Sequence, residues 1–277
     1  MRSTNDGKDW ELHKSGDESQ SWASVTYGNG NFVAVGATAF GDMFTPKTYL
    51  GSTMISTDDG ITWSAEAVLP SPLDKNDWKS VTFGNGVFVA VAGNDAQHPN
   101  SYAKSMSSLD GISWSAHATL IDGVGEQINV AFGNQVFIAA GDSYDEDTGA
   151  QICVMTSANN GDSWTDPKGP CGGAAIAYGG GVFVLVGYAS TSMRSLDNGK
   201  SWTNIDLPIK WWKGIVFGNN MFYAADFYGI LMVSKDLGLS WTLEATFAAR
   251  PCLLACGGTT CIAVSASGPG NATILNP

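Results

Sequence analysis

An eight-residue phrase, Ser-x-Asp/Asn-x-Gly-x-x-Trp, recurs six times along the chain and constrains its fold more than any other feature. In each copy the short carboxylate or amide can hydrogen-bond the backbone two residues on, and the glycine accepts the positive φ angle of a tight turn. The tryptophan then begins the outgoing strand and covers the turn with a large apolar ring. We name the copies boxes A to F; they span residues 3–10, 56–63, 107–114, 157–164, 195–202 and 234–241.

Each box contributes an acid or amide, a glycine and a tryptophan to its predicted turn. In box C the third place holds Leu109, and the acid stands one place later, beside the glycine. The predicted turn residues are Asn5, Gly7, Trp10, Asp58, Gly60, Trp63, Asp110, Gly111, Trp114, Asn159, Gly161, Trp164, Asp197, Gly199, Trp202, Asp236, Gly238 and Trp241.

A second phrase alternates with the boxes and also appears six times. It consists of two runs of β-branched or aromatic residues around Gly-Asn-Gly or a relative of it, which is a strong signal for a β-hairpin. The copies span residues 24–36, 80–93, 129–141, 175–187, 214–226 and, in degenerate form, 253–265. Each repeat therefore supplies two hairpins, or four strands.

The spacing of the repeats predicts the architecture. The box glycines lie 38 to 53 residues apart, and four-stranded repeats of this length are typical of a β-propeller. We predict one all-β domain over residues 1–277, a six-bladed β-propeller of four-stranded blades. The blades are expected at 22–70, 78–120, 127–168, 173–206, 212–246, and 250–277 together with 1–12. The N-terminal strand is expected to join the C-terminal blade as its outermost strand and so to close the ring.

Charge and hydropathy exclude several classes of partner. The chain has 14 basic and 26 acidic residues, a net charge of −12, which disfavours nucleic acid and anionic membrane surfaces, because binding there depends on neutralising phosphates. No stretch approaches the apolar length of a membrane span. Residues 1–6 are polar and lead directly into box A, so we expect no signal peptide.

The five cysteines make an odd count, which favours free thiols in a reducing cytoplasm. Cys256 and Cys261 flank the last hairpin turn and could face each other, either as a disulfide or, as the sequence favours, as two small core residues. Cys153, Cys171 and Cys252 show no metal-ligand spacing. We predict no cofactor and no metal site.

Sequence variation is concentrated on one side of the predicted blades. The second turns of the first three repeats carry insertions, at 37–50, 94–102 and 142–149, and loops on a rigid scaffold commonly carry binding. The same side holds Phe227 and the one tryptophan, Trp211, that packing does not explain. Aromatic rings among acids and amides suit sugars, although each ring could instead anchor its own loop. The predicted ligand-binding residues are Tyr49, His98, Tyr102, Tyr144, Asp145, Asp147, Tyr188, Trp211 and Tyr228.

The acidic loop 145–149 has alternating oxygen ligands and a glycine, as a calcium site requires. The 12-residue calcium-loop pattern with a closing glutamate is absent, so a solvated acidic loop is the favoured interpretation.

The boxes resemble the Asp-box, or BNR repeat, of sialidases, sortilin-type receptors, some glycoside hydrolases, photosystem assembly factors and lectin-like propellers. The alternating hairpin and box phrases also resemble propellers of bacteriophage virion and tail proteins. The resemblance covers nearly the whole chain. It implies the fold more than an activity.

A sialidase-like activity is not supported by the residues. That family requires three arginines at the substrate carboxylate and an Arg-Ile-Pro segment, whereas this chain has only Arg2, Arg194 and Arg250 and no such segment. Nothing in the sequence pairs Asp226 or the other acids of the variable side as glycosidases need. There is no Gly-x-Ser-x-Gly elbow. We expect a protein that is not an enzyme, with a glycoside hydrolase as the least favoured alternative.

The sequence thus favours a non-catalytic recognition or adhesion module. The resemblance places it in a bacteriophage virion or tail, assembled in the bacterial cytoplasm, where it would bind a host surface glycan or receptor through the loops of blades 1–3. The alternative is a purely structural virion component that docks on other virion proteins.

Overall fold

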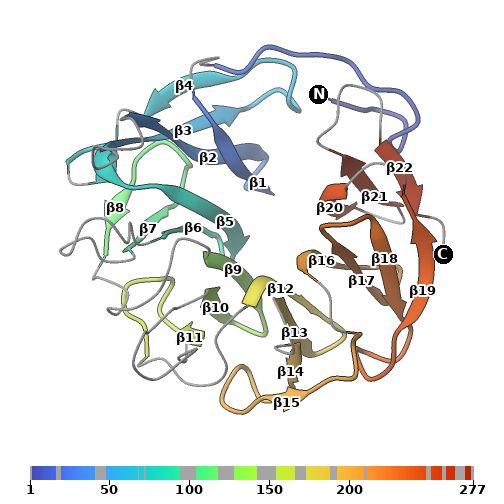
Figure 1. The fold of residues 1–277 in the computed structure, drawn as a ribbon. Coiled ribbons are helices and arrows are strands. Elements are labelled where there is room, and N and C mark those ends of the chain that lie inside the picture. Colours follow the sequence, from blue (N-terminus) through green and yellow to red (C-terminus); the bar gives the residue numbers. More distant parts are fainter. Residues whose placement is uncertain are drawn as a thin grey trace. The chain divides into compact units, whose positions relative to one another are not determined.

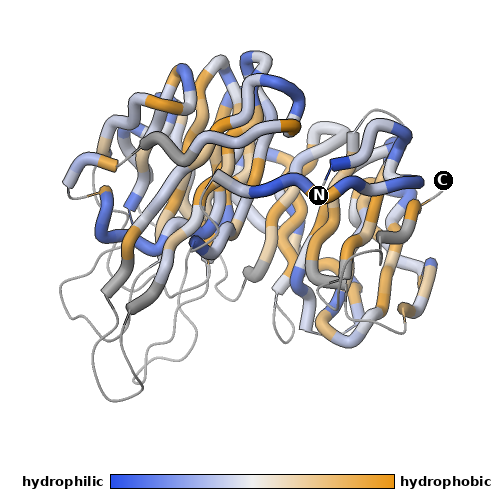
Figure 2. The backbone as a smooth tube through the Cα atoms, turned by 90° about the horizontal axis from the view of Figure 1, so that it is seen from above, coloured by the Kyte–Doolittle hydropathy of each residue, from blue (hydrophilic) through white to orange (hydrophobic). Residues whose placement is uncertain are grey.

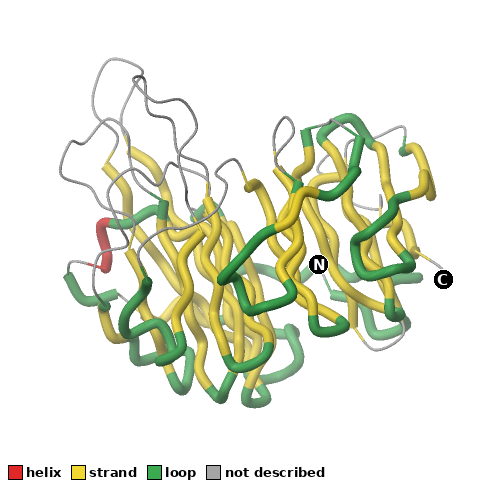
Figure 3. Tube along the Cα trace, turned by 90° about the horizontal axis from the view of Figure 1, so that it is seen from below, coloured by secondary structure: helices red, strands yellow, loops and turns green. Residues whose placement is uncertain are grey.

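The computed structural model describes residues 2–16, 20–40, 48–67, 69–71, 73–93, 104–117, 128–141, 154–165, 173–187, 192–208, 211–247, 251–257, 260–265 and 272–275 (Figure 1). These residues form an all-β structure of six antiparallel sheets. One short helical turn, Leu73–Lys75, accompanies the strands (Figure 3). No helix in this described part of the chain is long and apolar enough to cross a membrane.

The chain divides into two compact units: unit 1 comprises residues 1–12 and 169–277, and unit 2 comprises residues 13–168. Unit 2 contains three sheets, each a meander of sequential strands. The first is β1 (Trp22–Gly28), β2 (Asn31–Phe40), β3 (Thr48–Ser56) and β4 (Ser64–Ala67). The second is β5 (Trp78–Gly84), β6 (Val87–Ala92), β7 (Lys104–Ser108) and β8 (Ser115–Ala116). The third is β9 (Ile128–Gly133), β10 (Val136–Gly141) and β11 (Val154–Ser157).

Unit 1 repeats the same plan in three further sheets. The fourth sheet is β12 (Gly173–Gly179), β13 (Val182–Gly187), β14 (Met193–Ser195) and β15 (Thr203–Asn204). The fifth is β16 (Trp212–Gly218), β17 (Met221–Asp226), β18 (Ile230–Ser234) and β19 (Thr242–Thr246). The sixth is β20 (Pro251–Gly257), β21 (Thr260–Ser265) and β22 (Ala272–Leu275). Four of the six sheets have the predicted four strands, and the third and sixth have three strands among the described residues.

Part of the first predicted insertion belongs to a sheet rather than to a loop. Residues 37–40 extend β2 and residues 48–50 extend β3, and the two extensions pair in register from Ala37 opposite Gly51 to Phe40 opposite Thr48. Thr38, Phe40, Thr48 and Tyr49 are β-branched or aromatic residues, which are enriched in strands. Residues 41–47 and the predicted insertions at 94–102 and 142–149 lie outside the described residues.

The second strands of the sheets supply much of the core. β6, β13 and β17 are buried at every position, as expected of strands covered on both faces, which read as continuous apolar runs. Figure 2 shows the hydrophobic residues along the strands and the hydrophilic ones at the turns. The turns between first and second strands hold positive φ angles, such as 50° at Asn29 and 82° at Gly30, which the predicted Asn-Gly hairpin turn requires.

Five of the six boxes form the predicted turn, and box C forms a variant of it. In box B, Ser56 Oγ donates to Asp58 Oδ1 at 2.9 Å and accepts the Gly60 N–H at 2.8 Å, while Asp58 Oδ1 accepts the Thr62 N–H at 2.9 Å. The other five boxes repeat the serine-to-glycine bond at 2.8 to 2.9 Å. In five boxes the tryptophan Nε1–H donates to the box glycine carbonyl at 2.9 to 3.3 Å, which ties the outgoing strand to the turn.

Box C is one residue shorter than predicted. Its serine is Ser108, not Ser107: Ser108 Oγ donates to Asp110 Oδ1 at 2.9 Å and accepts the Gly111 N–H at 2.8 Å. Asp110 directly precedes Gly111, whereas in the other boxes one residue separates the acid or amide from the glycine. Asp110 Oδ1 still accepts the N–H groups of the two residues after the glycine, Ile112 and Ser113. The eight-residue register assigned from sequence to box C was therefore wrong.

The box glycine of one sheet packs on the second strand of the preceding sheet. Within unit 2, a side chain at Gly111 would meet Val33, and one at Gly161 would meet Val89. Within unit 1, Gly238 faces Val184 in the same way. The three valines hold the same place, the third residue after the hairpin turn. This contact recurs because only glycine lets the turn approach the strand so closely.

Box A follows this rule, which corrects the predicted role of the N-terminal segment. Gly7 lies over Ile262 of β21 and Ile274 of β22, so box A packs on the face of the last sheet. Residues 2–11 close their own small hairpin, in which Arg2 and Glu11 exchange two backbone hydrogen bonds of 2.8 Å. Within the described ranges no ladder joins this hairpin to the edge of β22. The N-terminal segment therefore contacts the last sheet, but not as its outermost strand.

A second contact between neighbouring sheets involves the glycine that ends each first strand. The ring of Phe83 covers Gly28, that of Phe132 covers Gly84 and that of Phe217 covers Gly179. Each covering ring also pairs with the aromatic residue opposite it in its own hairpin, for example Phe83 with Phe88 at 4.8 Å between centroids.

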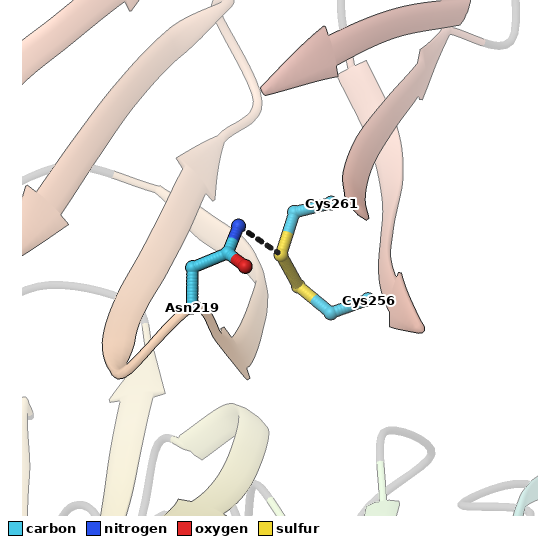
Figure 4. The surroundings of a disulfide bond; sticks show 3 residues. All are labelled: Asn219, Cys256 and Cys261. Carbon is cyan, nitrogen blue, oxygen red and sulfur yellow. Dashed lines mark hydrogen bonds between the residues drawn. A yellow bond between two sulfur atoms is a disulfide. The ribbon is translucent and has the colours of Figure 1, made fainter. Parts of the chain in front are cut away.

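The sixth sheet replaces this ring pair with a disulfide. Cys256 and Cys261 lie directly opposite each other in β20 and β21 and are bonded, with Cα atoms 4.1 Å apart. Their sulfur atoms cover Gly218, and Asn219 directs its amide toward Cys261 Sγ at 4.0 Å (Figure 4). The expectation of free thiols was wrong for this pair, because the hairpin register brings the two side chains together.

Candidate functional site

Three aromatic residues of unit 1 gather at one end of the fifth sheet. Trp211 precedes β16, and Phe227 and Tyr228 follow β17. The Trp211 ring centroid lies 6.4 Å from that of Phe227 and 6.5 Å from that of Tyr228, and the latter two rings meet edge to face at 5.4 Å. Trp211 is 54% exposed and Tyr228 is 58% exposed. We call these three residues the aromatic cluster.

Asp226 shapes the loop that carries two of the rings. Its side chain is completely buried, and its Oδ1 accepts the N–H of Tyr228 at 2.9 Å and that of Ile230 at 2.7 Å. Asp226 Oδ2 is buried without a partner among the described residues. A short carboxylate that bonds the backbone two and four residues on is a standard means of closing a tight turn. The acid therefore holds Phe227 and Tyr228 in place from beneath.

Backbone contacts fix the rest of the cluster. The Phe227 N–H donates to the Trp211 carbonyl at 2.8 Å, which joins the two segments that bear the rings. Gly229 holds a φ of 99°, and a Cβ there would lie 2.5 Å from the carbonyl oxygen of Phe247. Next to Trp211, Trp212 is completely buried and donates to the Pro208 carbonyl at 3.2 Å. The exposed rings thus stand on a rigid base.

This arrangement can bind but has few groups that could react. Two half-exposed rings at an angle offer apolar faces for stacking, while the indole N–H and the phenol O–H can reach polar groups of a ligand. The carboxylate nearest to the rings is buried and engaged in the loop. The geometry therefore suits recognition of a ligand with an apolar face and polar edges.

The structure brings together two of the nine predicted ligand-binding residues, Trp211 and Tyr228, and adds Phe227 to them. Tyr49 lies in β3 opposite Ala39, within the extended first sheet. The other six predictions, His98, Tyr102, Tyr144, Asp145, Asp147 and Tyr188, lie outside the described residues, as does the acidic loop. The sequence named Asp226 only as an acid near this side; the Asp-x-x-Gly spacing to Gly229 was the signal for its role in the loop.

The box carboxylates are engaged in their own turns. Hydrogen bonds from the Thr62 hydroxyl and N–H lower the pKa of Asp58 to about 2. Burial raises the pKa of Asp236, but hydrogen bonds from Ser240 outweigh it and lower that pKa to about 2. The N–H groups of Ser113 and Ile112 lower the pKa of Asp110 in the same manner. These acids stabilise turns and leave little capacity for a ligand.

A serine, a histidine and an acid lie in hydrogen-bonding order in unit 2. Ser107 Oγ is 2.6 Å from His117 Nε2, and His117 Nδ1 is 3.1 Å from Asp162 Oδ1. The order matches a nucleophilic triad. However, Ser107 lies within β7, which pairs with both β6 and β8, so the ladders engage the backbone N–H groups that would be needed as an oxyanion hole. We assign the trio to fastening box D onto the second sheet.

Comparisons with known proteins agree with the repeat and the fold. The family model described as BNR/Asp-box repeat matches residues 54–65, which include box B. No curated protein matches the sequence.

Three solved structures resemble the chain over almost all of its length. YCF48 bound to D1 peptide has 15% identity and a TM-score of 0.57, and the match covers 92% of this chain and 81% of that one. YjhT has 11% identity and a TM-score of 0.60, with coverage of 96% and 99%. The computationally designed protein Ika8 has 11% identity and a TM-score of 0.52, with coverage of 96% and 86%. At these identities the likeness concerns the fold alone, which is all-β and β-propeller-like.

Proposed function

We propose that this protein is a non-catalytic recognition module that binds a carbohydrate through the aromatic cluster. The observation that carries the proposal is the pair of half-exposed rings, Trp211 and Tyr228, held 6.5 Å apart on a loop closed by a buried acid. Rings of this kind stack on the C–H face of a sugar, and their polar tips reach its hydroxyl groups. The blades of the propeller serve as the scaffold that presents the rings.

A glycan array probed with the intact chain tests this proposal. We expect specific binding that Trp211→Ala and Tyr228→Ala each reduce by about 5-fold to 150-fold, because losing one stacked ring removes on the order of 1 to 3 kcal/mol of contact energy. Tyr27→Ala is the matched control, since Tyr27 is 53% exposed and lies in unit 2, outside the cluster. Binding that survives both cluster substitutions would disprove this site.

A protein partner is the second candidate. Its support is that one of the similar solved structures is YCF48 bound to D1 peptide, and that tryptophan, tyrosine and phenylalanine are enriched in protein interfaces. A peptide array screened with the same variants separates the two ligand classes. Loss of peptide binding in Trp211→Ala, together with a blank glycan array, would assign the cluster to a protein ligand.

The non-catalytic assignment is tested at Ser107. We expect no labelling of the protein by a fluorophosphonate probe, because the ladders that β7 forms with β6 and β8 engage the backbone around Ser107 that an oxyanion hole would need. Labelling that is abolished in both Ser107→Ala and His117→Ala would instead establish a nucleophilic site, and the protein would be an enzyme.

We extend the proposal to a virion or tail location, on the basis of the resemblance of the repeats to phage propellers. In that setting the ligand is a host surface glycan or receptor, and other virion proteins are further partners. Mass spectrometry of the proteins in purified phage particles tests this location. Absence of the protein from such particles would remove the location and leave the binding proposal intact.

A further inference from the structure

The three rings of the aromatic cluster, all in unit 1, are inclined to one another. The plane of Trp211 makes an angle of 45° with that of Phe227 and of 57° with that of Tyr228, and the latter two planes meet at 88°. A pyranose stacks its C–H face on one flat ring, so it cannot lie flat on two of these rings at once. The cluster therefore offers a sugar ring one face and leaves the others for a group of rounder shape.

The spacing of the rings suits a small cation. Their centroids lie 5.4 to 6.5 Å apart, so a single point can lie within the roughly 6 Å over which each ring face attracts a positive charge. The face of an aromatic ring is the negative side of its quadrupole. Several rings around one point are the arrangement that recognises alkylated ammonium groups.

A buried acid adds negative charge beside the rings. Asp226 is completely buried, and its Oδ1 accepts the N–H of Tyr228 at 2.9 Å. Its Oδ2 has no hydrogen-bond partner among the described residues. A buried acceptor without a donor is costly, and a positive charge nearby offsets part of that cost. The net charge of −12 favours the approach of a cation as well.

We propose that the carbohydrate bound at the aromatic cluster carries a positively charged ammonium group, as an amino sugar does. This inference rests on the carbohydrate site proposed above and specifies its ligand. The ammonium group lies against the three rings, where it is attracted by their faces and by Asp226. The adjoining sugar ring stacks on a ring face that the ammonium leaves open. N-acetylation of the amine removes the charge and with it both attractions.

Choline, which carries a permanent charge, is the first probe. It is titrated into the intact protein beside its uncharged analogue, in which a carbon atom replaces the ammonium nitrogen. Binding is followed by the NMR shift of the Trp211 indole N–H, which Trp211→Ala identifies. We expect choline to bind at least about fivefold more tightly than the analogue, because the two have the same shape and only choline is charged.

Two variants test the contribution of the acid. Asp226→Asn keeps the shape of the side chain and the Oδ1 acceptor, and it should weaken choline binding severalfold while leaving the uncharged analogue unaffected. Glu244→Gln removes one negative charge at an exposed position of β19 in the same sheet, and it should change neither. The inference is overturned if the uncharged analogue binds the wild-type protein as tightly as choline, a comparison that does not depend on the folding of any variant.

The glycan array supplies the second test, through pairs of glycans that differ only in a free or an N-acetylated amine. At a pH where the amine is protonated, we expect binding to the free amine to be at least about fivefold tighter, and this preference should be lost in Trp211→Ala. Equal binding of both members would overturn this inference and leave the carbohydrate site intact. An array on which no glycan binds would remove the carbohydrate site itself, and this inference with it.

Discussion

Phe83 and Cys256 occupy the same place in their repeats, and each covers the glycine that ends the first strand of the preceding sheet. In the second sheet the cover is an aromatic ring paired with Phe88 at 4.8 Å. In the sixth sheet it is a disulfide between Cys256 and Cys261. The contact therefore requires a group of sufficient bulk over the glycine, and it does not require an aromatic ring.

The ring pair and the disulfide differ in what holds them in place. Phe88 is completely buried within an apolar cluster of unit 2, so the ring pair is held by packing on all sides. The sixth sheet has smaller residues at this place, Cys256 and Cys261, and Cys256 is only partly buried. A covalent link suits such a sheet, because a disulfide does not depend on neighbours to hold its two strands together.

Removing a ring from the Phe83–Phe88 pair should have the largest effect on the free energy of unfolding. We expect Phe88→Ala to lower the free energy of unfolding by about 3 to 5 kcal/mol, because a completely buried phenylalanine leaves a cavity. Chemical denaturation measures this. The control is Leu109→Ala, at a leucine 71% exposed in box C, which should cost less than about 0.5 kcal/mol. Equal losses in both variants would show that the ring pair is not part of the core.

A tightly covered glycine and a loosely covered one should respond differently to the same substitution. Gly84→Ala places a Cβ into the ring of Phe132, and we expect a loss of about 2 to 3 kcal/mol from overpacking. In Gly214→Ala the atom nearest to the Cβ lies 3.8 Å away, on Leu254, so the loss should be less than about 0.5 kcal/mol. A comparison of the two denaturation midpoints tests this contrast, and a loss of similar size at both glycines would contradict it.

Removing the disulfide should lower the free energy of unfolding somewhat less than Phe88→Ala or Gly84→Ala does. It closes a short loop between residues 256 and 261, for which the loss of unfolded-state entropy corresponds to about 2 kcal/mol. Cys261→Ser should therefore unfold earlier than the wild type under non-reducing conditions. Dithiothreitol should lower the stability of the wild type and leave that of Cys261→Ser unchanged. If the reductant affects both proteins equally, the pair does not contribute in this way.

The smallest effect on stability concerns the box carboxylates and appears only at low pH. The folded pKa of Asp58 and of Asp236 is about 2, below the ordinary value of 3.8. A lowered pKa adds stability above pH 3.8 that is lost as the pH falls toward 2. Part of the decrease in Tm over this window should disappear in Asp58→Asn/Asp236→Asn. Boxes A and D already carry Asn5 and Asn159, so Asn5→Asp should steepen the decrease, and an unchanged profile would contradict the assignment.

Local chemistry made much of the fold predictable. The hairpin turns and boxes are closed by hydrogen bonds between residues two to four positions apart, such as Ser56 to Gly60, so short phrases specify them. Box C was assigned to Ser107 because Ser107 stands four residues before the glycine, as in the other boxes, whereas the hydrogen bonds select Ser108. Residues 37–50 were predicted to be an inserted loop because this segment is longer than its counterparts in the other repeats. In the structure residues 37–40 and 48–50 pair as strands.

The candidate site was predictable only in part. Trp211 stood out because packing explained every other tryptophan, and Tyr228 because of its place after a predicted strand. Their approach to 6.5 Å depends on the bond from Phe227 to the Trp211 carbonyl and on the burial of Asp226. The bond from Phe227 to Trp211 has no sequence signature, and the Asp-x-x-Gly spacing signals only the loop that Asp226 closes.

The sequence alone determined the all-β class, the repeated hairpins and the box turns, since these depend on residue type and short spacing. Only the tertiary structure decided that box A packs on the face of the last sheet and that Cys256 bonds Cys261. Contacts between repeats depend on which side chain fills which space, and a pattern within one repeat does not specify its neighbour.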